Sequence, residues 1–303
     1  MTTGTPWPPL ALAEWQDTCV TLHMWTQVVG KTQLALTPLM NHWWNVTFRV
    51  SPQGLRTHSL FYGDITLEME FDLIHHKLLI ETSEGAERQI AFYPRSVADF
   101  YSEYLSTMKS LGIEVKINTT PSELPDPIPF EQDHKHAAYD KECVDRFRRI
   151  LIRSDRVFNE FRARFIGKSS PVYFFWGAFD LAVTRFSGKT APKRPGVDRM
   201  MNEAYSHEVS SCGWWPGDGR FPEPIFYSYA APAPENFDKA TVRPAKAFWQ
   251  PQLGEFVLKY DDLRTSATPD QDLLDFCQST YEAAANLAGW DRAALERVAK
   301  APA

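Results

Sequence analysis

The chain has 303 residues, of which 14% are aromatic (10 Trp, 11 Tyr and 20 Phe). This aromatic content excludes a disordered chain, because disordered chains lack the apolar surface to form a core. The 32 Lys and Arg against 38 Asp and Glu give a formal net charge of -6, which argues against nucleic-acid binding, since phosphates attract a basic surface. No apolar run approaches the roughly 20 residues needed to span a bilayer, and the first residues have no signal-peptide pattern. We therefore expect a cytoplasmic globular protein with no nucleic-acid or membrane partner.

The four cysteines lie far apart in the sequence, at Cys19, Cys143, Cys212 and Cys277. They form no Cys-x-x-Cys pair, which excludes a structural zinc site of that type. A chain of this length does not need disulfides for stability. We expect four free, mostly buried thiols in a reducing cytoplasm.

The first half of the sequence reads as a helix, a run of strands, a helix and a strand. Apolar residues at three- and four-residue steps predict a helix over residues 11–29, with Gly30 placed to end it. From Trp43 the apolar period changes towards two, which predicts strands down to residue 92. Ser96 is placed to cap the next helix, with Asp99 three residues on, and a strand is predicted over residues 114–118.

One predicted strand in this half has an acidic face. Apolar and polar residues alternate from Thr66 to Asp72, so that Glu68, Glu70 and Asp72 share one side. We interpret this side as a solvated sheet face, and we expect alanine at all three positions to leave the melting temperature within a few degrees.

The proline-rich residues 121–138 are the best candidate for a linker. After them the pattern predicts a long helix over 140–165 and strands at 171–187, 205–213, 225–230 and 254–260. A helix opened by Asp270 and a short helix capped by Asp291 follow. The predicted fold class is therefore α+β, with two consecutive helix–antiparallel sheet–helix units over residues 1–120 and 139–303. A duplication would explain this order, although no residue-level self-similarity supports it.

The segment 171–187 is apolar on both predicted faces, which is typical of a strand buried on two sides. Asp180 and Arg185 in it therefore need partners, because an isolated buried charge is costly. Gly177 indicates close approach of another backbone or a ligand. The alternative to a ligand site is a rigid central strand with a purely structural role, in which Asp180 and Arg185 pair with buried partners.

A second candidate for chemistry is the segment 204–217, in which His207 and Glu208 lie on a predicted strand. The ordinary pKa of histidine suits proton transfer near neutral pH. We expect His207 to reach a cavity lined by aromatic residues. A metal site would need a distant third ligand, and His42 is the candidate to join His207.

Tryptophans beside turns or glycines can stack on a planar ligand or enclose a cation, and core packing explains them equally well. The candidates for substrate binding are Trp44, Trp176 and Trp214. Arg162 and Arg185 are further candidates for substrate binding, as anchors for an anionic group. Arg162 lies at the rim of its predicted helix, and we expect Arg162 or Arg185 to pair with Asp180 or Glu208.

Several specific motifs resemble one bacterial family. They include Asn-His-Trp-Trp at 41–44, Pro-Arg-Ser-Val-Ala-Asp-Phe-Tyr at 94–101, Phe-Phe-Trp-Gly at 174–177 and Ala-Tyr-Ser-His-Glu-Val-Ser-Ser at 204–211. The resemblance covers nearly the whole chain, and the family is catalogued as a domain of unknown function. It implies a bacterial protein and carries over no catalytic residues.

Two functions of different classes fit these patterns. The first is a small-molecule enzyme with an aromatic-lined pocket in the C-terminal half, in which His207, Glu208 and Asp180 are catalytic. The second is a non-catalytic module that binds a ligand or partner. Convergence of the charged groups on one cavity would favour the enzyme, and their dispersal would favour the module. The sequence names no cofactor.

Overall fold

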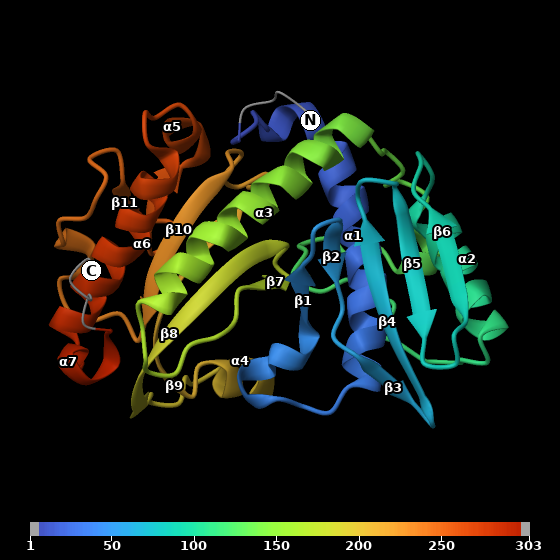
Figure 1. The fold of residues 1–303 in the computed structure, drawn as a ribbon, viewed down its shortest axis with the longest axis horizontal. Helices are drawn as coiled ribbons and strands as arrows, with labels where there is room; N and C mark the ends of the chain where they lie inside the picture. Colours follow the sequence, from blue (N-terminus) through green and yellow to red (C-terminus); the bar gives the residue numbers. More distant parts are fainter. Residues whose placement is uncertain (1–5, 298–303) are drawn as a thin grey trace, which may run out of the picture. The chain divides into compact units, whose positions relative to one another are not determined.

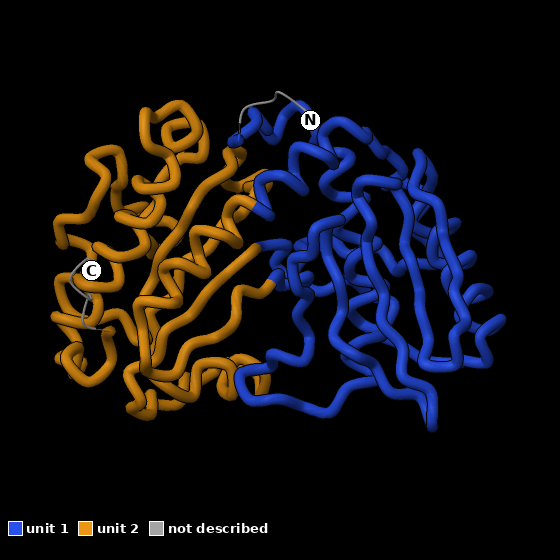
Figure 2. The backbone as a smooth tube through the Cα atoms, viewed as in Figure 1, with its two compact units in different colours: residues 1–152, 174–180 blue, residues 153–173, 181–303 orange. Residues whose placement is uncertain are grey.

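The computed structural model describes residues 6–297. The chain divides into two compact units, coloured blue and orange in Figure 2. Unit 1 contains residues 1–152 and 174–180, and unit 2 contains residues 153–173 and 181–303. The boundary falls inside helix α3 (Lys141–Ala163). The division predicted from the sequence, into domains at 1–120 and 139–303 joined by a linker at 121–138, concerns which parts of the chain fold independently. It stays a prediction.

Unit 1 is built on an antiparallel sheet with the strand order β7-β1-β2-β4-β5-β6, and β3 pairs with β4. Helices α1 (Leu12–Leu36) and α2 (Val97–Ser110) lie behind this sheet in Figure 1. The strands are β1 (Thr47–Val50), β2 (Gly54–Arg56), β3 (Leu60–Tyr62), β4 (Ile65–Asp72), β5 (Lys77–Thr82), β6 (Glu87–Ala91) and β7 (Tyr173–Phe175). Two 3-10 turns are η1 (Asn41–Val46) and η2 (Phe130–Gln132).

Helix α1 does not end at Gly30, as the sequence predicted, but continues to Leu36. A Cβ atom at Gly30 would lie 2.4 Å from the indole ring of Trp176. Glycine is therefore in the helix interior because Trp176 packs against its backbone. The long run of buried residues from Met24 to Gln33 also explains why the helical period was weak in the sequence.

Two short segments of unit 1 differ from their predicted structure. Residues 114–118 form no strand. Residues 41–46 form η1 instead of the start of a strand, with His42 and Trp43 at φ values of 58° and 61°, and the strand begins at Thr47. The cap of α2 is as predicted, because Ser96 Oγ accepts a hydrogen bond from the Asp99 backbone N–H at 3.1 Å.

The interpretation of the acidic face of β4 as plain solvated surface is wrong. Glu70 and Asp72 are buried, at 6% and 5% exposure. Arg56 on β2 lies in register with Glu70 and donates hydrogen bonds to Glu68 (2.6 Å) and Glu70 (3.2 Å). Asp72 accepts hydrogen bonds from the backbone N–H and the ring of His75. Alternation along a strand identifies its two faces, but only the neighbouring strands decide whether a face is covered.

Unit 2 contains an antiparallel sheet with the strand order β11-β12-β10-β9-β8. Its strands are β8 (Asp180–Thr190, whose first residue belongs to unit 1), β9 (His207–Trp215), β10 (Ile225–Ala231), β11 (Phe248–Gln250) and β12 (Glu255–Lys259). The helices are α4 (Arg199–Ala204), η3 (Phe237–Lys239), α5 (Tyr260–Arg264), α6 (Pro269–Leu287) and α7 (Arg292–Leu295). Helix α6 packs against β9 and β10 (Figure 1). Helices with antiparallel sheets confirm the α+β class.

The predicted continuous strand 171–187 is wrong, because a turn over residues 176–179 separates β7 from β8. The Phe179 backbone N–H donates to Phe175 O at 2.8 Å, and Phe179 has a φ of 59°. The side chain closest to Gly177 is Glu123, whose Oε1 lies 2.4 Å from the position of a Cβ atom. The expected close approach at Gly177 is therefore made by a side chain of the same unit.

All four cysteines are free and buried, as the sequence predicted. None of the helices within residues 6–297 is both long and apolar enough to cross a membrane.

Candidate functional site

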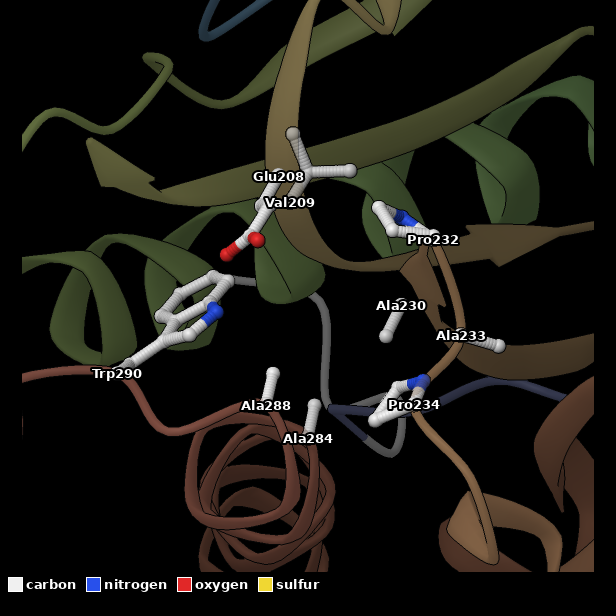
Figure 3. A pocket seen from close by; sticks show the side chains of 9 residues that line it. All are labelled: Glu208, Val209, Ala230, Pro232, Ala233, Pro234, Ala284, Ala288 and Trp290. Atoms are coloured by element: carbon white, nitrogen blue, oxygen red, sulfur yellow. The ribbon is translucent and has the colours of Figure 1, made fainter. Parts of the chain in front are cut away.

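A cavity of about 180 Å³ lies in unit 2, between β9, the end of β10 and the C-terminal half of α6 (Figure 3). Among the side chains of its wall, the polar groups are one carboxylate and one indole N–H. The lining residues are Glu208, Val209, Ala230, Pro232, Ala233, Pro234, Ala284, Ala288 and Trp290. The carboxylate of Glu208 points towards the ring of Trp290 in Figure 3.

The polar atoms of this wall have no protein partner. Glu208 Oε2 is enclosed and accepts no hydrogen bond from any described residue. Trp290 is 7% exposed, and its Nε1 likewise has no acceptor within the described part of the chain. Buried polar atoms are costly unless they are hydrogen-bonded. Glu208 Oε2 and Trp290 Nε1 are therefore an acceptor and a donor in wall residues that no described residue satisfies.

Local structure explains how these side chains reach the cavity. Ala284 and Ala288 are four residues apart at the end of α6 and share one helix face, where their small side chains leave space. Gly289 follows with a φ of 62°, and the backbone N–H of Trp290 donates to Ala285 O at 2.8 Å. This reversal at the helix end turns the indole back over the cavity.

His207 begins β9, as predicted, but it does not line the cavity. Its neighbours Glu208 and Val209 do. His207 is half-buried, and its Nδ1 lies 3.1 Å from the hydroxyl oxygen of Ser206.

Both arginines have partners other than Glu208. Arg185 is fully buried, with its guanidinium 3.5 Å from the ring centre of Phe161 and 4.3 Å from that of Tyr281. It donates to Phe161 O and to Gln278 Oε1. Burial lowers the pKa of Arg185 to about 10. Arg162 is half-buried and donates to Ser170 O at 2.7 Å. Neither forms an ion pair with Glu208, because aromatic rings and carbonyl oxygens hold the guanidinium groups instead.

The remaining candidates are dispersed. Asp180, Trp176, Trp44 and His42 belong to unit 1, whereas the cavity belongs to unit 2. Asp180 is 8% exposed, and Trp44 is half-buried with its ring 5.2 Å from that of His42. Trp214 is fully buried and packs edge-to-face against Tyr260.

A metal site at His42 or His207 lacks further ligands. Within residues 6–297, no three His, Cys, Asp or Glu side chains lie close enough together to hold a metal ion.

Comparison with known families confirms the resemblance seen in the motifs. The chain belongs to DUF5996. This is a family of unknown function, and its model matches residues 7–297. No curated protein and no solved structure matches the chain. DUF5996 therefore supplies no catalytic residues, and the function has to be argued from this chain's own geometry.

Sequence reasoning missed Trp290 as a cavity residue. The signal that could have indicated it is Ala-Gly-Trp at 288–290, where a glycine ends a helix and an aromatic residue follows directly. In the sequence, Ala284 and Ala288 cannot be distinguished from other helix residues. Their role in the cavity comes only from their position opposite Glu208.

Proposed function

We propose that the chain is a binding module that takes up a small ammonium ligand in the cavity of unit 2. The observation that carries this proposal is the enclosed Glu208 Oε2 without a hydrogen-bond partner among the described residues. A carboxylate in such a place is satisfied best by a charged donor, because charge-assisted hydrogen bonds are the strongest available.

The rest of the wall limits the kind of ammonium ligand. The ring of Trp290 lies beside the carboxylate (Figure 3) and can attract a cation over its face. Its Nε1 needs an acceptor, which a hydroxyl group on the ligand would supply. The alanines and prolines accommodate a short aliphatic chain. A cavity of about 180 Å³ is smaller than the range of about 300–1,000 Å³ typical of drug-sized ligands. A hydroxyalkylamine of a few heavy atoms meets all of these requirements.

Binding is better supported than catalysis in this cavity. Glu208 is the one titratable side chain on its wall, and none of its lining residues is a serine, cysteine or histidine. Arg162 and Arg185 are held by carbonyl oxygens and aromatic rings, and neither they nor Asp180 line this cavity. The enzyme hypothesis with His207 as an acid–base group has no corresponding support from the wall.

Isothermal titration calorimetry with ethanolamine, ethylene glycol and acetate tests this proposal. We expect ethanolamine to bind, and the neutral and anionic probes to bind at least 10-fold more weakly. Glu208→Gln should lower the affinity for ethanolamine at least 10-fold, which corresponds to about 1.4 kcal/mol. Trp290→Phe, which keeps a ring but removes the N–H donor, should lower it less.

Glu235→Gln is the matched control, because Glu235 is an exposed carboxylate next to the wall residue Pro234. It should leave the affinity unchanged. Binding that Glu208→Gln does not weaken, or no binding of ethanolamine at millimolar concentration, would refute the proposal.

A further inference from the structure

Unit 1 contains a lysine–serine pair that is separate from the residues of the ligand cavity. Lys31 on α1 is 7% exposed, and its Nζ donates to Ser122 Oγ at 3.0 Å. Ser122 lies in the loop between α2 and η2 and is half-buried. The ring centre of Trp176 lies 5.9 Å from Lys31 Nζ.

The serine is held in place from the same helix. The fully buried side chain of Gln27 donates through Nε2 to Ser122 O (2.9 Å) and accepts through Oε1 from the Ser122 backbone N–H (2.7 Å). His23 Nε2 in turn lies 3.0 Å from Gln27 Nε2 and 2.9 Å from Gly177 O. His23, Gln27 and Lys31 are four residues apart, so they share one face of α1. Such a framework fixes the position of the hydroxyl relative to Lys31.

The backbone beside the serine is strained. Glu123 has a φ of 60°, a left-handed conformation that is uncommon for a residue other than glycine. Residues held in this way persist only where the surroundings enforce them, and they cluster at functional sites. Trp176 Nε1 is enclosed and has no acceptor among residues 6–297.

The surroundings of Lys31 make its ammonium group more acidic than usual. Among the described residues, no carboxylate forms an ion pair with Lys31. Burial lowers the pKa of Lys31 from its ordinary value. A neutral amine within hydrogen-bond distance of a hydroxyl is the arrangement that activates a serine in serine–lysine enzymes.

We propose that Ser122 and Lys31 form a nucleophile–base dyad that hydrolyses an uncharged carboxylic ester. Lys31 Nζ takes the hydroxyl proton while Ser122 Oγ forms a bond to the ester carbonyl carbon. The bond from that carbon to the alcohol oxygen then breaks, and the alcohol leaves with the proton from Lys31. Water adds to the acyl-serine and gives a proton to Lys31. The bond to Ser122 Oγ breaks, Ser122 recovers its proton from Lys31, and the carboxylic acid leaves.

The surroundings of the dyad define the class of ester. Glu123 follows the nucleophile directly, and its carboxylate, which lies beside Gly177, disfavours an anionic substrate. The indole of Trp176 offers an apolar surface beside Lys31 for a small acyl group. An ester suits this dyad better than an amide, because an alcohol leaves more easily than an amine.

The direct test is covalent labelling by a fluorophosphonate, with mass spectrometry of the digested protein. We expect one phosphonyl adduct, on the peptide that contains Ser122. Ser122→Ala should abolish it, and Lys31→Met should slow its formation at least 100-fold, the lower end of a general-base contribution. Ser106 is an exposed serine of α2 and serves as the matched control, so Ser106→Ala should label at the wild-type rate. The same order of variants should hold for hydrolysis of p-nitrophenyl acetate.

A second measurement keeps the test decisive if Lys31→Met fails to fold. Ser122→Cys retains Lys31, and its thiol should react with iodoacetamide at pH 7 at least 10-fold faster than a model thiol, because a nearby base or cation increases thiolate character. Absence of an adduct on Ser122, or labelling of a folded Lys31→Met at the wild-type rate, would show that the bond between Lys31 and Ser122 is only structural. Neither result depends on ligand binding at Glu208.

Discussion

Gly30 shows that the residue type required at one position can depend on a distant part of the chain. It lies in the interior of the 25-residue helix α1, where glycine is less favourable than alanine by about 1 kcal/mol. In the sequence this glycine looked like a helix end. In the structure it is required because Trp176, 146 residues later in the numbering, lies against its backbone.

Gly30→Ala should destabilise the protein although alanine is the better helix former. A Cβ atom would lie 2.4 to 2.5 Å from three atoms of the Trp176 indole, so the ring must move. Overpacking typically costs about 1–3 kcal/mol, and after the gain of about 1 kcal/mol in helix propensity we expect a net loss of up to about 2 kcal/mol. Urea unfolding measures this difference.

Gly219→Ala is the control for that substitution, since a Cβ atom at Gly219 has no neighbour within 4 Å and its φ is ordinary. It should change the free energy of unfolding by less than about 0.5 kcal/mol. If Gly30→Ala were as stable as the wild type, the packing of Trp176 on α1 would not be what requires glycine.

At the scale of elements, β4 shows what alternation can and cannot predict. The spacing of Glu68, Glu70 and Asp72 correctly indicated that they share one face of a strand. It did not indicate that Arg56, in register with Glu70, and Ser51 would cover this face. Cross-strand neighbours are the unit of sheet stability, and they come from separate parts of the sequence.

Glu70→Ala should therefore destabilise the protein, contrary to the expectation for a solvated face. Glu70 is 6% exposed and accepts hydrogen bonds from Arg56 (3.2 Å) and Ser51. Its removal leaves the Ser51 hydroxyl and part of the Arg56 guanidinium without an acceptor, for a loss of about 1–3 kcal/mol. Thermal or urea unfolding of the variant measures the loss.

The comparison for this variant is Glu84→Ala, at an exposed carboxylate in the turn after β5. A change of less than about 0.5 kcal/mol is expected there. Equal stability of the two variants would restore the interpretation of the β4 face as solvated surface.

At the scale of the whole molecule, the four thiols report on burial in both units. Cys19 and Cys143 belong to unit 1, and Cys212 and Cys277 to unit 2. Burial raises the pKa of Cys19, Cys143 and Cys277, and the Cys277 thiol is in addition within hydrogen-bond reach of Cys212. Only the thiolate reacts with disulfide reagents, so a raised pKa and burial both suppress the reaction.

We expect none of the four thiols to react with dithionitrobenzoate within minutes at pH 8 in the folded protein. All four should react after unfolding in guanidinium chloride. The exposed position in Ser106→Cys provides a positive control, which should add one fast-reacting thiol. A fast-reacting thiol in the unmodified folded protein would contradict the burial of these residues.

Much of the fold was predictable because it depends on neighbours in the sequence. The α+β class, the helices α2, α3, α6 and α7, and the caps Ser96 and Asp291 follow from periodicity and from the hydrogen bonds of helix ends. The strand positions of His207 and Glu208 and the free cysteines were also correctly predicted. Membership of a family of unknown function followed from motifs spread along the chain.

The candidate sites depended on the tertiary structure. Packing decided that Glu208 rather than His207 faces the cavity, that Trp290 closes over it, and that Arg185 lies among Phe161, Phe165 and Tyr281. It also brought Ser122 to Lys31, a contact between residues 91 positions apart. Local sequence determines which backbone conformation a segment prefers. The partners of a buried charge are selected by burial, since any polar atom that packing brings within reach can satisfy it.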